Sequence, residues 1–315
     1  MATSRVIFAA LRLGGRRAEG QRARGGVVDH LVLLKPRVMS LVVFTGAVGY
    51  ALAPGPIDWL RMIATLSAMA AGAGACGALN MWWDADIDAN MARTAMRPIP
   101  RGAVPPNQAL AIGVLLGVVS VAALGHQTNW LAAGLLALTI AIYVPLYTMT
   151  LKRRTPQNIV IGGAAGALPP VIGWAAASGG VSIGALALFL FIFLWTPPHF
   201  WALALCRSRD YERVGVPMLP NVVGPAETCR QIALYAVLLA AASFGPLLIP
   251  GVGLLFGLVA ALCDGVLLWR VYALYRLRKG DETLLRKAAM ALFGYSILYM
   301  FLIYAALLAE VLIRR

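Results

Sequence analysis

Three of the 13 acidic residues of this 315-residue chain lie together at Asp84, Asp86 and Asp88. Asn80, Asp84 and Asp88 are spaced four residues apart, so a helix would place them in one stripe, with Asp86 on roughly the opposite side. Stacked carboxylates repel one another and need cations in an apolar setting. Oxygen ligands at this spacing suit Mg²⁺ bound together with substrate phosphates. The alternative is a solvated acidic loop.

Basic residues follow this stripe. Arg93 and Arg97 are joined by Arg101 in a stretch stiffened by Pro98 and Pro100. A guanidinium group fits a phosphate through two parallel hydrogen bonds, so arginines beside a metal site can bind a diphosphate. The alternative is that they only mark a cytosolic loop.

A second polar group, Asp210-Tyr211-Glu212, follows an apolar segment. Asp210 is a candidate ligand for a second metal ion, and Tyr211 a candidate substrate contact. The competing interpretation is an ion pair of Asp210 with Arg207 or Arg213, which lie at helical spacing from it.

Two further polar residues interrupt apolar segments. His199 follows Pro197 and Pro198, and on a regular helix it shares a face with Asp210. A histidine within a membrane is a candidate functional residue, although a hydrogen-bonded packing histidine is a close alternative. Asp264 has no partner that the sequence can identify.

Aromatic and basic residues also occur together near residue 150. Tyr147 precedes Lys152 and Arg153, which form a charge cluster of the kind that ends a membrane span. We expect aromatic rings such as Trp82, Trp83 and Tyr147 to stabilise a carbocation.

The composition indicates which elements must position these residues. With 60% hydrophobic and 13% charged residues, the chain is too apolar for a soluble domain, which averages about half and a quarter. Segments in lipid must satisfy their backbone hydrogen bonds internally, which predicts an all-α polytopic membrane protein. Nine apolar segments approach the length of a span: 36–53, 60–82, 109–125, 130–149, 158–177, 182–205, 231–249, 252–273 and 289–311.

The net charge of +14 reports topology rather than a nucleic-acid partner. If the N-terminus is cytoplasmic, every lysine and arginine except Arg61, Arg314 and Arg315 falls on the cytosolic side. Both polar groups then lie at that face. We expect residues 1–30 to form a disordered basic cytoplasmic tail, with a mitochondrial presequence as the alternative, and residues 31–315 to form one intramembrane domain.

These features favour an intramembrane transferase acting on an isoprenyl diphosphate. A CDP-alcohol phosphotransferase also carries paired aspartates, but Asn80 replaces its glycine and 67–73 lacks its acid and arginine. A transporter would place charges along a transmembrane path, whereas the acids here gather at one face, except for Asp264.

The Asn80-x3-Asp84-x3-Asp88 stripe resembles the first signature of the UbiA superfamily of intramembrane prenyltransferases. Three later strings resemble the haem-modifying branch of that superfamily: 166–173, 196–204 and 210–220. The second motif departs from the wider superfamily because Val214 stands where an aspartate is usual. The second metal site is therefore expected to have fewer ligands.

This resemblance implies a nine-helix bundle around a central cavity open to the cytosolic face. It implies Mg²⁺-dependent transfer of a farnesyl group from farnesyl diphosphate to a vinyl group of haem B, with addition of water, to give haem O for terminal oxidases. The alternative is another aromatic acceptor, such as a quinone or chlorophyll precursor. The expected location is a bacterial inner membrane, with the mitochondrial inner membrane as the alternative. A haem A synthase or an oxidase assembly factor is the expected protein partner.

The resemblance also assigns roles by position. Asn80, Asp84, Asp88 and Asp210 would hold Mg²⁺ and diphosphate. Contact with the porphyrin is expected of His199. The residues expected to contact substrate are Asn80, Arg93, Arg97, Tyr147, Lys152, Arg153 and Tyr211.

Overall fold

The computed structural model describes residues 25–314, and within them the chain is helical with no β-strand. Eight spans are long and apolar enough to cross a membrane. A ninth is counted if the bent pair α2 (Val27–Leu33) and α3 (Pro36–Leu52) forms one span. The all-α polytopic fold is therefore confirmed, and nine is the upper count of spans among the residues that the structure describes.

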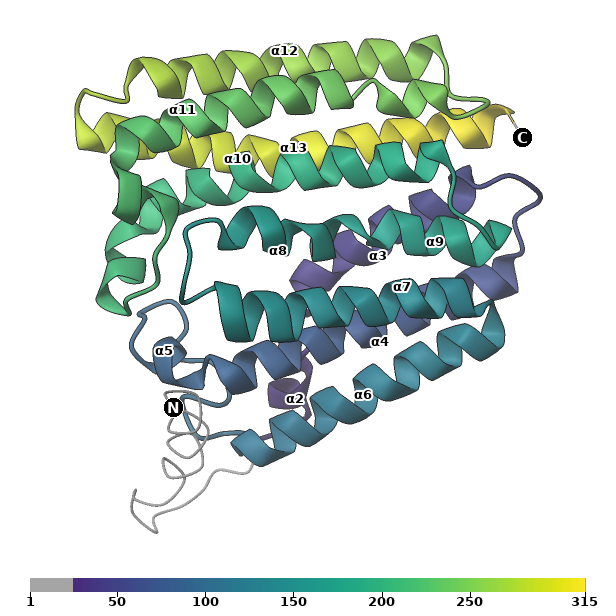
Figure 1. Cartoon of the computed structure of the whole chain (residues 1–315), viewed down its shortest axis with the longest axis horizontal. Helices are drawn as coiled ribbons and strands as arrows, with labels where there is room; N and C mark the ends of the chain where they lie inside the picture. Colours follow the sequence, from purple (N-terminus) through teal and green to yellow (C-terminus); the bar gives the residue numbers. More distant parts are fainter. Residues whose placement is uncertain (1–24, 315) are drawn as a thin grey trace.

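The helices run alongside one another as a bundle (Figure 1). Neighbouring helices are joined by short connections, as expected for antiparallel packing. The remaining elements are α4 (Trp59–Trp83), α5 (Ala85–Ala89), α6 (Pro106–Gln127), α7 (Trp130–Ala141), η1 (Ile142–Leu151), α8 (Asn158–Ala167), α9 (Pro169–Ser178), α10 (Ile183–Arg213), α11 (Leu219–Ala242), η2 (Gly245–Leu248), α12 (Leu254–Arg276) and α13 (Glu282–Arg314).

Three predicted segments extend further than expected, and one of them, predicted over 289–311, already begins in α13 at Glu282. The span predicted over 182–205 continues in α10 to Arg213, across a kink at Arg207, where φ is −120° and ψ is 18°. The span predicted over 231–249 already begins in α11 at Leu219, with a break at Gly224. Gly224 has a φ of 82°, because a residue before proline avoids the α-helical region and glycine tolerates a positive φ.

Helices α3 and α9 approach each other backbone to backbone. A Cβ on Gly49 would lie 2.1 Å from the carbonyl oxygen of Pro170, and one on Gly173 would lie 2.1 Å from that of Gly46. Small residues at such a crossing let membrane helices pack closely. This contact fixes α9, the second part of the broken span α8–α9, against α3.

Buried polar contacts join the last three long helices. The Asp264 carboxylate of α12 lies 2.6 Å from the hydroxyl of Tyr299 on α13 and 2.6 Å from that of Ser243, which follows α11. Nearby, the backbone N–H of Phe256 donates to the carboxylate of Glu310 at 3.0 Å. Asp264, which the sequence left unassigned, thus has hydrogen-bond partners on two neighbouring elements.

The predicted disordered tail falls mainly on residues 1–24, which lie outside the described residues, so that part stays a prediction. Its last four residues, 27–30, belong to α2. Helix α2 is tied to the loop that follows α5, because Arg101 pairs with Asp29.

Candidate active site

The acidic stripe forms where α4 turns into α5. The N–H of Asp84 donates to the carbonyl of Asn80 at 2.9 Å, and the N–H of Asp88 donates to that of Asp84 at 2.8 Å, so the helical spacing continues through the junction. Asn80, Asp84 and Asp88 are only 5%, 0% and 2% exposed. A solvated acidic loop is therefore not what this stripe forms.

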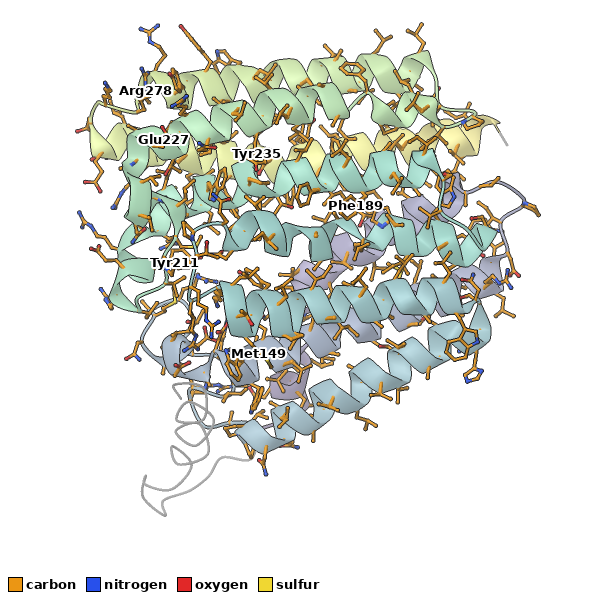
Figure 2. All side chains as sticks on the ribbon, viewed as in Figure 1. Met149, Phe189, Tyr211, Glu227, Tyr235 and Arg278 are labelled. Carbon is orange, nitrogen blue, oxygen red and sulfur yellow. The ribbon has the colours of Figure 1, made fainter. Side chains whose placement is uncertain are left out.

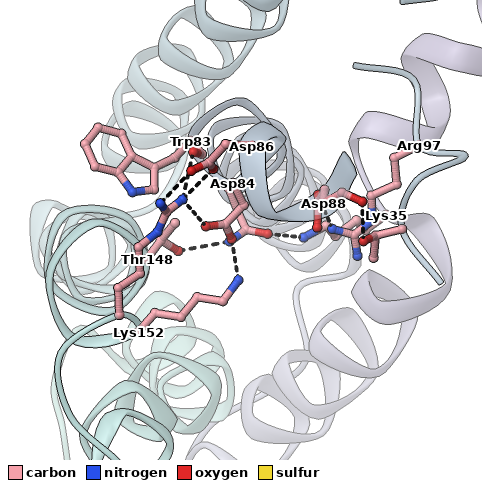
Figure 3. A network of polar contacts seen from close by, with 11 residues as sticks. Lys35, Trp83, Asp84, Asp86, Asp88, Arg97, Thr148 and Lys152 are labelled. Atoms are coloured by element: carbon pink, nitrogen blue, oxygen red, sulfur yellow. Dashed lines mark hydrogen bonds and ion pairs between the residues drawn. The ribbon is translucent and has the colours of Figure 1, made fainter. Parts of the chain in front are cut away.

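Each member of the stripe meets a cation from a different part of the chain. The Lys152 ammonium lies 2.5 Å from Oδ2 of Asp84, and Nη1 of Arg97 lies 2.6 Å from Oδ2 of Asp88. Nζ of Lys35 donates to Oδ1 of Asn80 at 2.6 Å. Figure 3 shows Lys152 approaching from one side, with Lys35 and Arg97 on the other. Lys152 and Arg97 neutralise the two carboxylates, which burial alone would destabilise.

Lys35 is a site residue that was not among those expected from the sequence. Lys35 lies between α2 and α3 with a φ of 51°, and it is the one non-glycine residue with a positive φ among those described. This strained conformation is uncommon outside glycine and often accompanies a functional constraint. The available signal was a lysine directly before the proline that begins the first span.

Asp86 points away from the stripe and holds Arg153 instead. Two guanidinium nitrogens of Arg153 lie 2.7 Å from the two carboxylate oxygens of Asp86. Burial acts to raise the pKa of Asp86, but its hydrogen bonds and attraction to Arg153 outweigh that effect and lower it. The same hydrogen bonds raise the pKa of Arg153. Arg153 is thereby fixed 3.5 Å from Oδ1 of Asp84.

A cavity of about 170 Å³ opens beside the stripe. One end is polar and carries cations, while its walls are aromatic and aliphatic. The lining residues are Asn80, Ile87, Asp88, Met91, Arg93, Arg97, Tyr143, Tyr147, Lys152, Ile159, Phe200, Tyr211, Val216 and Met218.

The aromatic wall differs in part from the expectation. Tyr147 lines the cavity as predicted, together with Tyr143, and their ring centroids are 5.6 Å apart. Trp82 and Trp83 are not among the lining residues, and Phe200 is. Tyr147 is seated against Gly162 of α8, where an added Cβ would lie 2.4 Å from its ring.

Asp210, the predicted ligand of a second metal ion, does not lie at the cavity beside the acidic stripe. Tyr211 lines the cavity, whereas Asp210 and Glu212 do not. Tyr211 lies near one end of the bundle, well away from Phe189 on the same helix (Figure 2). Within residues 25–314, no three histidine, cysteine or acidic side chains gather closely enough to hold a metal ion. The salt bridges of the described residues include none between Asp210 and Arg207 or Arg213.

His199 is not at the cavity. Its ring stacks against Trp195 and Phe293, with centroids 4.2 and 4.6 Å away, and its Nδ1 lies 2.7 Å from the Ser296 hydroxyl of α13. The kink at Arg207 also removes the regular helix on which His199 would share a face with Asp210. The next residue, Phe200, lines the cavity in its place.

The donor set of the stripe fits a hard cation. Oδ1 of Asp84 is buried and accepts no hydrogen bond from any described residue. The amide oxygen of Asn80 and the carboxylate of Asp88 lie on the same stripe. Carboxylate and amide oxygens with substrate phosphates are the ligands that Mg²⁺ prefers. The residues of the stripe are therefore chemically suited to a magnesium–diphosphate site.

Two proteins of known name are similar to this chain along most of its length. The protein named protoheme IX farnesyltransferase from Methylobacterium nodulans is 54% identical over 288 residues, 91% of this chain and 90% of that protein. The protein of the same name from Parvibaculum lavamentivorans is 57% identical over 287 residues, 91% of this chain and 89% of its own length.

A solved structure shares the fold. A UbiA homolog from Archaeoglobus fulgidus, bound to DMAPP and Mg²⁺, superposes with a TM-score of 0.66 at 16% identity, covering 87% of this chain and 99% of that one. The pattern of the UbiA prenyltransferase family matches residues 42–297, which is most of the chain. The chain therefore belongs to the UbiA prenyltransferase family.

Proposed function

We propose that this protein transfers a farnesyl group from farnesyl diphosphate to a vinyl group of haem B, with addition of water, to give haem O and diphosphate. The observation that carries the proposal is a buried acidic stripe, neutralised by cations, at the polar end of an aromatic cavity. The two farnesyltransferases that are over half identical to the chain along most of its length support haem as the acceptor.

The polar end of the cavity would bind the diphosphate. Arg93, Arg97 and Lys152 all line the cavity, so their charged groups can contact an anion that enters it. Arg153, fixed by Asp86, adds a positive charge beside Asp84. When bound by Asn80, Asp84 and Asp88, Mg²⁺ would supply the charge that neutralises the leaving diphosphate.

The apolar walls would then govern the carbon chemistry. The C–O bond of farnesyl diphosphate breaks with both electrons going to the diphosphate, which leaves an allylic cation. The π faces of Tyr143 and Tyr147 can stabilise this charge, and the apolar walls limit premature attack by water. The terminal vinyl carbon of haem bonds to the farnesyl carbon, a hydroxyl from water bonds to the other vinyl carbon, and the water proton is released.

The charge distribution supports an orientation with the N-terminus in the cytoplasm and the cavity at the cytosolic side. The bacterial sources of both relatives support a place in a bacterial inner membrane. The product would pass to a haem A synthase or an oxidase assembly factor.

Acceptor-dependent diphosphate release tests this function. The purified protein would be given farnesyl diphosphate and Mg²⁺ with haem B or with a hydroxybenzoate-type aromatic acceptor. We expect release to depend on haem B. Release that depends on the hydroxybenzoate and not on haem would favour the quinone-precursor reaction and contradict the haem assignment.

A further inference from the structure

The segment η1, Ile142–Leu151, is a π-helix that forms the second half of the membrane span Trp130–Leu151. Its backbone N–H groups bond to carbonyls five residues back instead of four, and the N–H of Lys152 continues this pattern to the carbonyl of Tyr147 at 2.9 Å. Short π-helical segments are rare and are frequent at functional sites. The segment directly precedes the lysine that contacts Asp84.

The π geometry changes which side chains share a face. Residues five apart lie about 140° apart around an α-helix, but they lie on the same side of the helix when the hydrogen bonds span five residues. Tyr143 and Thr148 form one such pair, and Tyr147 and Lys152 form the other. All four meet the site. The two tyrosines line the cavity, Oγ1 of Thr148 lies 3.2 Å from Nδ2 of Asn80, and Lys152 contacts Asp84.

Two residues that do not line the cavity account for this geometry. Pro145 has no N–H, and its ring crowds the carbonyl four residues back, which belongs to Ala141, the last residue of α7. The hydroxyl of Thr150 donates to the carbonyl of Pro145 at 2.8 Å, again across five residues. Pro145 is exposed on the outside of the bundle.

We propose that Pro145 and Thr150 are positioning residues that hold η1 in its π register. That register turns Thr148 toward Asn80 and Lys152 toward Asp84, and thereby sets the affinity for the prenyl diphosphate. The link to affinity rests on the proposed function, whereas the link to side-chain direction does not.

A double-mutant cycle on farnesyl diphosphate binding tests the link to affinity. Dissociation constants in the presence of Mg²⁺ would be measured by calorimetry for wild type, Pro145→Ala, Lys152→Ala and the double variant. We expect about a tenfold loss for each single variant, the order of one charge-assisted hydrogen bond. The double variant should lose less affinity than the product of the two single losses, because Pro145 acts in part through Lys152. Losses that multiply would overturn the proposal.

Thr150 provides a second variant that keeps the proline. Thr150→Val should weaken binding, and Thr150→Ser should restore it. Thr139 is the matched control, because its hydroxyl donates to the carbonyl of Leu135 at 2.9 Å in the α-helical part of the same span. Thr139→Val should leave the dissociation constant unchanged. Equal losses for Thr139→Val and Thr150→Val would show a general helix effect and contradict the proposal.

A cross-link separates the register from the function. In a chain whose four native cysteines are replaced, Asn80→Cys and Thr148→Cys should form a disulfide under mild oxidation, because their side chains are in contact. Adding Pro145→Ala should abolish it. A wild type that binds no farnesyl diphosphate would refute the proposed function alone. A cross-link that is absent with Pro145 present, or that persists after Pro145→Ala, would overturn the register proposal itself.

Discussion

The ammonium group of Lys152 lies 2.5 Å from Oδ2 of Asp84, a carboxylate with no solvent exposure, and the same lysine lines the cavity. Arg97 repeats the arrangement at Asp88, 2.6 Å away. Each cation thus contacts a protein carboxylate while its side chain faces the space where a diphosphate would bind. Removing either member of such a pair leaves an uncompensated buried charge.

Asp84 tests the acidic stripe. Asp84→Asn should reduce farnesyl transfer by about a hundredfold or more, because it removes a charged ligand and leaves Lys152 unpaired. Asp58→Asn is the matched control. Asp58 lies at the other end of α4, where its carboxylate accepts from the N–H of Arg61 at 3.0 Å, and asparagine caps a helix equally well. Transfer rates and membrane yield would be measured for both, and near-normal rates for Asp84→Asn would remove the metal-site assignment.

Arg97 tests whether the loop arginines do more than mark topology. Arg97→Lys keeps the charge but loses the planar fork that reaches Asp88 and a phosphate, so we expect a ten- to hundredfold lower kcat/KM, roughly the loss of one charge-assisted hydrogen bond. Arg101→Lys, in the same loop and paired with Asp29 of α2, should have little effect. Wild-type kinetics for Arg97→Lys would support the topological interpretation.

Substitution of Gly162 tests whether the position of the Tyr147 ring matters for transfer. Gly162→Ala would place a Cβ 2.4 Å from the tyrosine ring, so the ring must move, and we expect kcat/KM to fall about ten- to a hundredfold. Gly166→Ala in the same helix α8 meets no atom within 4 Å and should retain activity with equal or higher stability. Equal activity of the two variants would show that the position of Tyr147 is not important for transfer.

His199 tests a packing role against a role in binding haem. His199→Ala removes the contacts with Trp195 and Phe293 and the hydrogen bond to Ser296, so the free energy of unfolding should fall by about 2–5 kcal/mol. The KM for haem should stay unchanged. Thermal unfolding and initial rates would be compared with those of Phe200→Ala, which should raise a KM instead. A raised KM for haem with unchanged stability would return His199 to the porphyrin site.

Much of the fold follows from the hydropathy of the sequence and from the positions of its prolines and glycines. The predicted spans agree with the observed helices where a proline lies at or shortly before the start of an apolar run, as at α3, α4 and α6. The four-residue spacing likewise predicted the stripe from Asn80 to Asp88, because such a spacing has one geometric meaning on a helix. The extension of α10 past residue 205 could not be predicted, since polar residues continue a helix once it leaves the apolar layer.

The rest of the site depends on contacts between distant segments. Lys35 reaches Asn80 only because α2 and α3 meet at an angle beside the end of α4. Lys152 was a candidate by charge, but its direction depends on the π-helix that Pro145 induces. His199 looked functional because it is polar in an apolar run, and Ser296, almost a hundred residues later, satisfies it.

Analysis of the reaction product tests whether the protein converts haem B to haem O. The purified protein would be incubated with haem B, farnesyl diphosphate and Mg²⁺ in water enriched in ¹⁸O, and the porphyrin would be examined by mass spectrometry. We predict that the wild type yields a porphyrin heavier by one farnesyl group and one water, with the heavy oxygen retained. The Asp84→Asn variant should yield none of this product. Unchanged haem B under conditions where the wild type consumes farnesyl diphosphate would contradict this prediction.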